Sequence, residues 1–175
     1  MYGGISVVVT QLPVEELSWV QIPYVSQLKN MLSKNVKETE KIAKIFIGKL
    51  LKDKGKYKGA LVVGLSGDLG SGKTAFTKFV AKHLGIRGRV FSPTFVIFKK
   101  YPIKLDKYRF FFHMDAYRLK DERELINLGW EEIISNREHL VFIEWPENIA
   151  KAIPLDARFI YISDDKNNYR NFRLK

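Results

Sequence analysis

Residues 67–74 read Gly67-Asp68-Leu69-Gly70-Ser71-Gly72-Lys73-Thr74. They match the phosphate-binding pattern G-x-x-x-x-G-K-[ST] at every defined position. The apolar run at 60–65 that precedes them is typical of a strand buried on both faces. Helical periodicity begins at Lys73 and continues to about Leu84, where Gly85 is expected to stop the helix. A glycine-rich turn between a buried strand and a helix is the context that this pattern requires, so the sequence predicts a P-loop.

The predicted P-loop has the groups that a nucleoside triphosphate needs. Its glycines allow successive backbone N–H groups to turn towards phosphate oxygens, and the helix N-terminus adds the positive end of its dipole. Lys73 can bridge the β- and γ-phosphates, and the Thr74 hydroxyl can ligate Mg²⁺. We therefore expect ATP and Mg²⁺ as ligands. The candidate nucleotide-binding residues of this segment are Gly67, Asp68, Gly70, Ser71, Gly72, Lys73, Thr74 and Ala75.

Two further segments each place an acid after an apolar strand-like run. One run ends in Glu144 and the other in Asp115. Ligands of such folds gather at the carboxyl ends of the strands, so both acids are expected to converge on the phosphates. Together with Lys73 they are the candidate catalytic residues, and either acid can orient the attacking water. His113 is expected to be a packed or hydrogen-bonded histidine and not a metal ligand.

Two other segments keep alternative interpretations. Ser92-Pro93-Thr94 is either a switch segment whose hydroxyls sense the γ-phosphate or a simple turn. Arg118 either stabilises charge on the phosphates or pairs with the acids at 121–124.

The rest of the chain alternates strand-like and helix-like segments, which is typical of the α/β class. A helix is expected from Asn35, which forms a capping-box pattern with Glu38, to a stop at Gly55. An acidic helix is expected over 121–128, with Asp121 as its N-cap. Strands are expected at 95–101, 109–113 and 140–144, and as a terminal hairpin at 158–162 and 169–174. Because strands cluster after residue 95, some antiparallel pairing is expected. The predicted fold is a P-loop NTPase-type mixed sheet with flanking helices.

The 175 residues carry a formal net charge of +11 and no cysteine. Without cysteine the chain has no thiolate catalysis, zinc-thiolate site or iron–sulfur cluster. The basic excess suggests a polyanionic neighbour. Its lysine-rich stretch at 29–58 is either a solvated helix face or a nucleic-acid-binding patch.

No targeting segment or membrane span is apparent, so we expect a cytoplasmic protein. Residues 1–30 lack basic side chains except Lys29 and are interpreted as an extension, and 31–175 as a P-loop ATPase domain.

Several ordered motifs resemble the TsaE family, the small ATPases of tRNA threonylcarbamoyladenosine biosynthesis. The resemblance covers about residues 31–175. It rests on the helix start at 35–39, the P-loop at 67–74, Ser92-Pro93-Thr94-Phe95, His113-Met114-Asp115-Ala116-Tyr117-Arg118-Leu119, Leu128-Gly129 and Ile143-Glu144-Trp145-Pro146-Glu147. The three motifs that follow the P-loop helix are more specific than the P-loop itself, because many families share a P-loop.

The resemblance implies a role for each motif. The P-loop binds ATP, Thr74 and Glu144 hold Mg²⁺, Asp115 is needed for hydrolysis, and Trp145 lies close to the nucleotide. It also implies TsaB- and TsaD-like partners, with tRNA contacted indirectly through the complex. TsaD transfers the threonylcarbamoyl group to the adenosine beside the anticodon. Ala75 stands where the family usually has Thr or Ser, which affects the rate of hydrolysis more than binding.

Two other functions are compatible with these residues. One is a P-loop kinase for a small hydroxylated substrate, for which Arg109 and Arg118 are the available evidence. The other is a nucleotide-dependent binding module with vestigial hydrolysis, which Ala75 permits.

Overall fold

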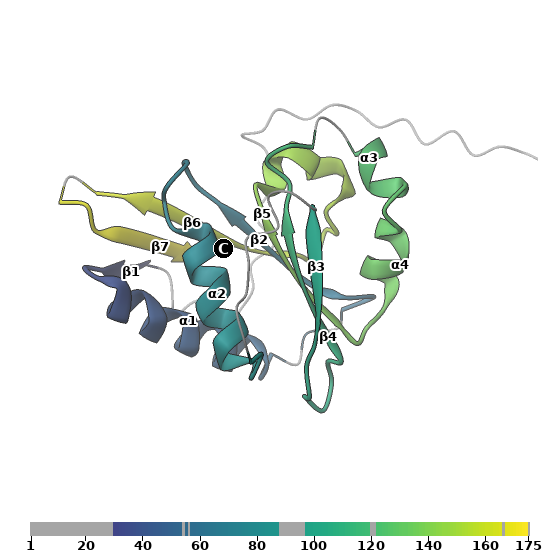
Figure 1. Cartoon of the computed structure of the whole chain (residues 1–175), viewed down its shortest axis with the longest axis horizontal. Helices are drawn as coiled ribbons and strands as arrows, with labels where there is room; N and C mark the ends of the chain where they lie inside the picture. The colour runs from purple at the N-terminus through teal and green to yellow at the C-terminus, as the bar shows by residue number, and fades with distance from the viewer. Residues whose placement is uncertain are drawn as a thin grey trace, which may run out of the picture.

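The computed structural model describes residues 30–53, 55, 57–87, 97–119, 122–165 and 167–174. These residues form one sheet in the strand order β1-β7-β6-β2-β5-β4-β3 (Figure 1). The strands are β1 (Asn30–Ser33), β2 (Leu61–Ser66), β3 (Phe98–Pro102), β4 (Phe110–Asp115), β5 (His139–Glu144), β6 (Arg158–Asp164) and β7 (Arg170–Leu174). The helices are α1 (Val36–Leu50), α2 (Lys73–His83), α3 (Arg123–Ile126), α4 (Trp130–Ser135) and the 3₁₀ segment η3 (Pro146–Ala152).

The sheet is parallel at its centre and antiparallel at both edges. Strand β2 pairs in parallel with both β5 and β6, and β4 pairs in parallel with β5. The pairs β3–β4, β6–β7 and β1–β7 are antiparallel. The predicted mixed sheet and the predicted terminal hairpin are therefore confirmed.

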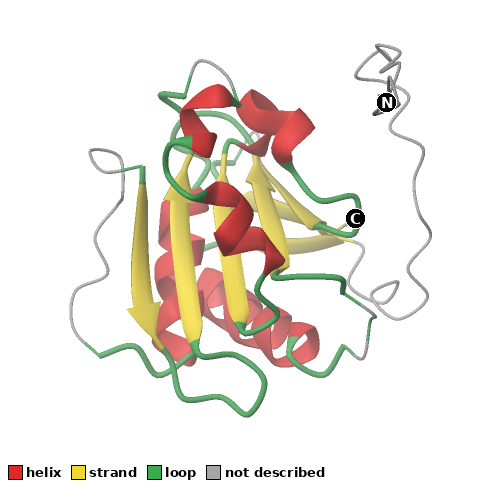
Figure 2. Ribbon diagram, turned by 90° about the vertical axis from the view of Figure 1, so that its right-hand side faces the viewer, coloured by secondary structure: helices red, strands yellow, loops and turns green. Residues whose placement is uncertain are grey.

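Helices cover both faces of the sheet (Figure 2). On one face α1 and α2 pack through Phe46 and Phe76 against a cluster that includes Phe142 of β5. On the other face, buried side chains of α3, α4 and η3 pack against the alternate residues of the same strands. Because the central strands are buried on both faces, they are nearly continuous apolar runs. This explains why the run at 60–65 was recognisable from sequence.

Strand alternation assigns the strand-end acids to one face. Phe111 of β4 and Phe142 of β5 lie in the cluster with α1 and α2. Side chains two residues apart on a strand share a face. His113, Asp115 and Glu144 therefore face the same side of the sheet as α2, the helix that follows the P-loop.

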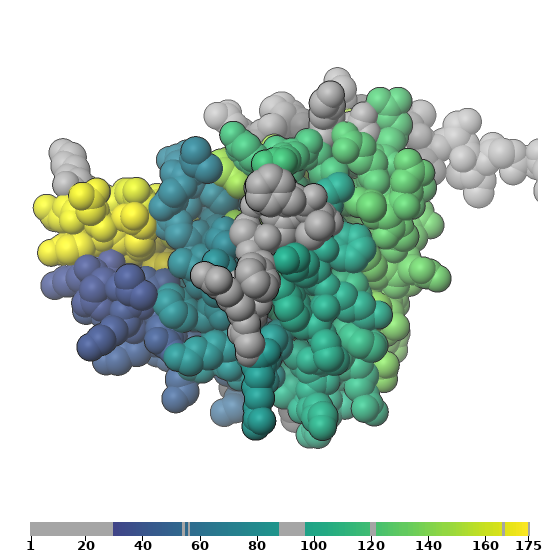
Figure 3. Space-filling view, viewed as in Figure 1, coloured from purple at the N-terminus to yellow at the C-terminus, as the bar shows by residue number. Residues whose placement is uncertain are grey.

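The β6–β7 hairpin and the β1–α1 segment adjoin on the surface, as the space-filling view shows (Figure 3). Strand β1, which the sequence did not predict, starts at Asn30 and pairs with β7. Residues 1–29 lie outside the described part of the chain. No helix among the described residues is long and apolar enough to cross a membrane.

Three boundary predictions were wrong. Helix α1 ends at Leu50 and not at Gly55, because Leu51 already forms the C-cap. The strand predicted from residue 95 excludes Ile97, whose positive φ of 63° is incompatible with an extended strand. The acidic helix over 121–128 is the short α3, with Glu122 at the N-cap position. Asp121, the predicted N-cap, lies outside the described residues.

Candidate active site

The P-loop follows β2 directly and is shaped by two glycines. Gly67 has φ of 146°, and a Cβ there would lie 2.0 Å from the carbonyl oxygen of Ile162. Gly72 is the N-cap of α2 and has φ of 103°. Both conformations strongly favour glycine. The chain can therefore turn tightly beside β6 and enter α2 with its first backbone N–H groups facing the loop.

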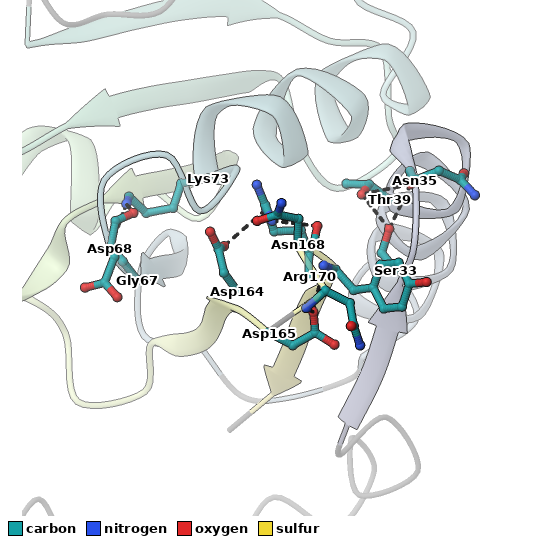
Figure 4. Close-up of polar contacts among 12 residues, drawn as sticks. Ser33, Asn35, Thr39, Gly67, Asp68, Lys73, Asp164, Asp165, Asn168 and Arg170 are labelled. Atoms are coloured by element: carbon teal, nitrogen blue, oxygen red, sulfur yellow. Dashed lines mark hydrogen bonds and ion pairs between the residues drawn. The ribbon is translucent and has the colours of Figure 1, made fainter.

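The side chain of Lys73 forms hydrogen bonds to the backbone of the loop that precedes it. Its Nζ donates to the carbonyl oxygens of Gly67 at 2.6 Å and Asp68 at 2.9 Å (Figure 4). The same Nζ lies 3.8 Å from the centroid of the Trp145 ring. Burial lowers the pKa of Lys73 below its usual 10.5, and the nearby carboxylates of Glu144 and Glu147 oppose that change. The ammonium is thus a buried donor held at the base of the loop.

Thr74 and Glu144 meet beside that lysine. The Thr74 hydroxyl donates to Glu144 Oε2 at 2.6 Å. The other oxygen of the carboxylate, Oε1, accepts from His113 Nε2 at 2.6 Å. The side chains of His113 and Glu144 are 0% and 3% exposed, so the hydrogen bond between them lies away from water, whereas the one from Thr74 is only partly buried. The expectation that His113 is hydrogen-bonded is confirmed.

Asp115 ends β4 directly opposite Glu144 of β5 in the parallel register. Its Oδ1 accepts from the backbone N–H of Tyr117 at 3.1 Å. The backbone N–H of Ala116 donates to the carbonyl oxygen of Glu144 at 2.9 Å, which ties the ends of the two strands together. The structure therefore brings both candidate acids to one edge of the sheet, as the strand-end pattern predicted.

Trp145 turns sharply away from the end of β5. Its φ is 60°, and its backbone N–H donates to the carbonyl oxygen of Leu65 at 3.1 Å. Its ring packs on that of Tyr117 at a centroid distance of 5.0 Å. A cavity of about 350 Å³ opens beside these rings. It is lined by Leu69, Gly70, Gly72, Lys73, Thr74, Ala75, Asp115, Tyr117, Arg118, Glu144 and Trp145.

This lining contains most of the residues expected from the sequence. Of the loop residues, Gly67, Asp68 and Ser71 lie outside the cavity lining, although Asp68 shares its carbonyl oxygen with Lys73 and with the N–H of Ser71. Leu69 and Tyr117 line the cavity and were not predicted. Tyr117 could have been suspected from its position two residues after Asp115. The segment at 92–94 lies outside the described residues.

The oxygen atoms of Thr74 and Glu144 suit Mg²⁺. A hydroxyl and a carboxylate oxygen 2.6 Å apart are hard ligands on one wall of the cavity. Mg²⁺ usually takes only one or two protein oxygens and completes its shell with water and phosphate. The residues present therefore fit a Mg²⁺–nucleotide complex.

A family model described as "Threonylcarbamoyl adenosine biosynthesis protein TsaE" matches residues 33–172. Proteins named tRNA threonylcarbamoyladenosine biosynthesis protein TsaE are similar to this chain. The one from Bacillus subtilis is 42% identical over 101 residues, which cover 58% of this chain and 60% of the relative. The one from Rickettsia felis is 36% identical, and the match covers 70% of this chain and 66% of the relative. The match thus spans less than two thirds of these two relatives.

Two other similarities extend over more of both chains. The Rickettsia typhi protein of the same name is 37% identical over 142 residues, which cover 79% of this chain and 89% of the relative. The crystal structure of YdiB from Bacillus subtilis superposes with a TM-score of 0.62 at 30% identity. It covers 83% of this chain and 82% of that one.

Proposed function

The chain belongs to the TsaE family, and we propose that it binds and hydrolyses ATP as a component of the machinery that makes tRNA threonylcarbamoyladenosine. The observation that carries the proposal is the meeting of Lys73, Thr74 and Glu144 at one cavity. Lys73 is the P-loop lysine, and the Thr74 hydroxyl lies 2.6 Å from a buried carboxylate oxygen. This combination of cation, hydroxyl and acid supports binding of a triphosphate together with a divalent cation.

In this proposal each residue has a defined role. Backbone N–H groups of the loop and of Ala75 bind the phosphates, and Lys73 leaves its two carbonyl partners to contact the β- and γ-phosphates. Thr74 and Glu144 hold Mg²⁺, which supplies positive charge to the phosphate oxygens when bound. Trp145 and Tyr117 cover one side of the bound phosphates and reduce their contact with water.

We assign the orientation of the attacking water to Asp115. Glu144 is assigned to Mg²⁺ in this proposal, and its carboxylate oxygens contact Thr74 and His113. Asp115 is the neighbouring acid on the same edge of the sheet and lines the cavity. A water held there would attack the γ-phosphoryl group, and catalysis is then mostly positioning and charge stabilisation.

The family relationship supports a wider setting, which is also proposed. The partners are TsaB- and TsaD-like proteins, tRNA is contacted through their complex, and the protein acts in the cytoplasm. Residues 1–30 are an extension of the P-loop ATPase domain at 31–175. Capture of proteins from the native organism by the tagged chain, with and without ATP, tests the partners. Absence of TsaB- and TsaD-like proteins under both conditions would contradict this setting.

ATP turnover with and without Mg²⁺ tests the activity. We expect Mg²⁺-dependent release of phosphate, slow without partners, and loss of ATP binding or hydrolysis in Lys73→Ala. Unchanged turnover in that variant would refute the site. Transfer of the γ-phosphoryl group to a small molecule would instead identify a kinase. Tight Mg²⁺-dependent binding without hydrolysis, even with partners, would identify a binding module.

A further inference from the structure

We propose that His113 is a positioning residue that orients the Glu144 carboxylate for metal-assisted nucleotide binding. The inference rests on the proposed function, because it assigns to His113 the task of fixing one of the two residues that hold Mg²⁺. The starting observation is the chain of three side chains from three elements: His113 of β4, Glu144 of β5 and Thr74 of α2. Two hydrogen bonds of 2.6 Å link them.

The direction of these hydrogen bonds follows from the chemistry of the groups. An ionised carboxylate can only accept, so the imidazole nitrogen that faces Glu144 carries the hydrogen. The other nitrogen, Nδ1, is buried and has no hydrogen-bond partner among the described residues. Among the described residues, Glu144 is thus the hydrogen-bond partner of the His113 ring.

The carboxylate needs such a partner to hold one orientation. The terminal torsion of a glutamate side chain is broad and has no sharp staggered minima. Strand β5 therefore positions the side chain of Glu144 but leaves the rotation of its carboxylate free. The hydrogen bond from His113 fixes Oε1, and Oε2 is then directed at the Thr74 hydroxyl. Partners of this kind behind a metal-binding carboxylate tune both its orientation and its affinity for the metal.

The location of His113 separates this role from direct catalysis. Its side chain is fully buried, and it is absent from the lining of the cavity. It stands two residues before Asp115 on the same strand and the same face, one layer deeper than the cavity wall. His113 therefore acts through Glu144 and does not touch the nucleotide.

The test compares two amide substitutions that differ in reach. The amide nitrogen of His113→Gln extends about as far as Nε2 and can still donate to Glu144, whereas that of His113→Asn is too short. Binding of ADP is measured calorimetrically in Mg²⁺ and in EDTA, and the ratio of the two affinities is the gain due to metal. We expect this ratio to fall roughly 10-fold in His113→Asn. We expect His113→Gln to keep it within about threefold and both to bind metal-free ADP like the wild type.

A control at another buried histidine measures the cost of burying an amide. His139 is 7% exposed, and its Nδ1 lies 2.9 Å from the carbonyl oxygen of Ile133, away from the cavity. We expect His139→Gln to lower the melting temperature without changing the metal-dependent gain.

The outcomes distinguish this inference from the function on which it rests. A wild-type protein that binds ADP equally with and without Mg²⁺ would contradict the metal site itself. A wild-type gain that both His113 variants retain, or that both lose equally, would overturn the positioning role alone. If His113→Asn does not fold, His113→Gln still decides, because loss of more than about threefold of the gain in that folded variant contradicts the inference.

Discussion

At the scale of single residues, Lys73 combines a proposed functional role with a position that disfavours its charge. Its ammonium is buried, and its partners are two carbonyl oxygens and the face of Trp145. Desolvation disfavours a charged amine, which is why the pKa of Lys73 lies below its usual value. Residues that hold charge ready for a ligand often destabilise the ligand-free protein. The same side chain that would bind phosphate therefore lowers the stability of the empty loop.

We expect Lys73→Met to abolish nucleotide binding while keeping or raising the melting temperature of the ligand-free protein. Methionine fills a similar volume without a buried charge, and the carbonyl of Asp68 keeps the N–H of Ser71 as a donor. A gain of about 1 kcal/mol corresponds to roughly 2–4 °C in a protein of this size. Calorimetric scans of both proteins without ligand check this, and a fall of several degrees in the variant would contradict it.

The pKa of Lys73 determines how the stability of the folded protein should change with pH. The folded pKa of Lys73 is lowered, so at pH values below it the lysine is charged in both the folded and the unfolded chain. As pH rises between the lowered folded pKa and the usual 10.5, the folded state releases its proton first, and folding becomes more favourable. The wild type should therefore gain stability relative to Lys73→Met over that range, and an unchanged difference would contradict the assignment.

At the scale of elements, helix α1 depends on a capped N-terminus. Asn35 Oδ1 accepts from the backbone N–H of Glu38 at 3.0 Å, and Glu38 Oε2 accepts from that of Lys34 at 2.7 Å. The Ser33 hydroxyl, buried at the end of β1, donates to the carbonyl oxygen of Asn35 at 2.8 Å (Figure 4). These contacts satisfy backbone groups at the point where the chain changes from strand to helix.

We expect Asn35→Ala to lower the free energy of unfolding by about 1 kcal/mol, because the side-chain acceptor for the helix N–H is lost. Asn35→Ser, which keeps an acceptor, should stay within about 0.5 kcal/mol of the wild type. Urea unfolding followed by circular dichroism measures both variants. Equal stability of the Ala and Ser variants would show that the cap does not stabilise the helix.

The elements that were predicted from sequence are those whose own residues determine them. Strands β2 and β5 are apolar runs with distinct ends, and α2 has a glycine before and after it. Strand β1, helix α4 and the 3₁₀ segment η3 were not predicted. Four residues form β1 through pairing with β7, and α4 begins after Gly129 in a left-handed conformation. Such contacts depend on distant segments, so local patterns do not reveal them.

In the candidate site, too, some features could be predicted from the sequence and others could not. Convergence of Asp115 and Glu144 followed from the rule that parallel strands end at one edge. The packing of the Trp145 ring against that of Tyr117 depends on the positive φ of Trp145, a conformation that residues with bulky side chains rarely adopt. The contact between His113 and Glu144 depends on the register of two strands. Neither register nor backbone strain is encoded in a short motif.

At the scale of the whole molecule, the net charge of +11 exceeds what the cavity uses. Among the residues that the structure describes, the basic side chains in its lining are Lys73 and Arg118. By contrast, α1 exposes Lys37, Lys41 and Lys44 on one side, at spacings of four and three residues. The described part of the lysine-rich stretch is therefore an exposed helix face, which is compatible with both sequence interpretations, a solvated face and a nucleic-acid-binding patch. Most of the basic excess is separate from the nucleotide site.

This separation predicts that the two kinds of anion binding respond differently to the same substitutions. We expect the isolated protein to bind tRNA only through non-specific electrostatics, with equal affinity for an unrelated RNA of the same length. Replacing Lys37, Lys41 and Lys44 by Gln should reduce the slope of log K against log salt by up to about 3, because each lost phosphate contact contributes roughly 0.9. The affinity for ADP should not change, since these lysines do not line the cavity. Fluorescence titrations at several salt concentrations measure the slope. A clear preference for tRNA would instead indicate direct recognition by this chain, and an unchanged slope would assign the electrostatic contact to other basic residues.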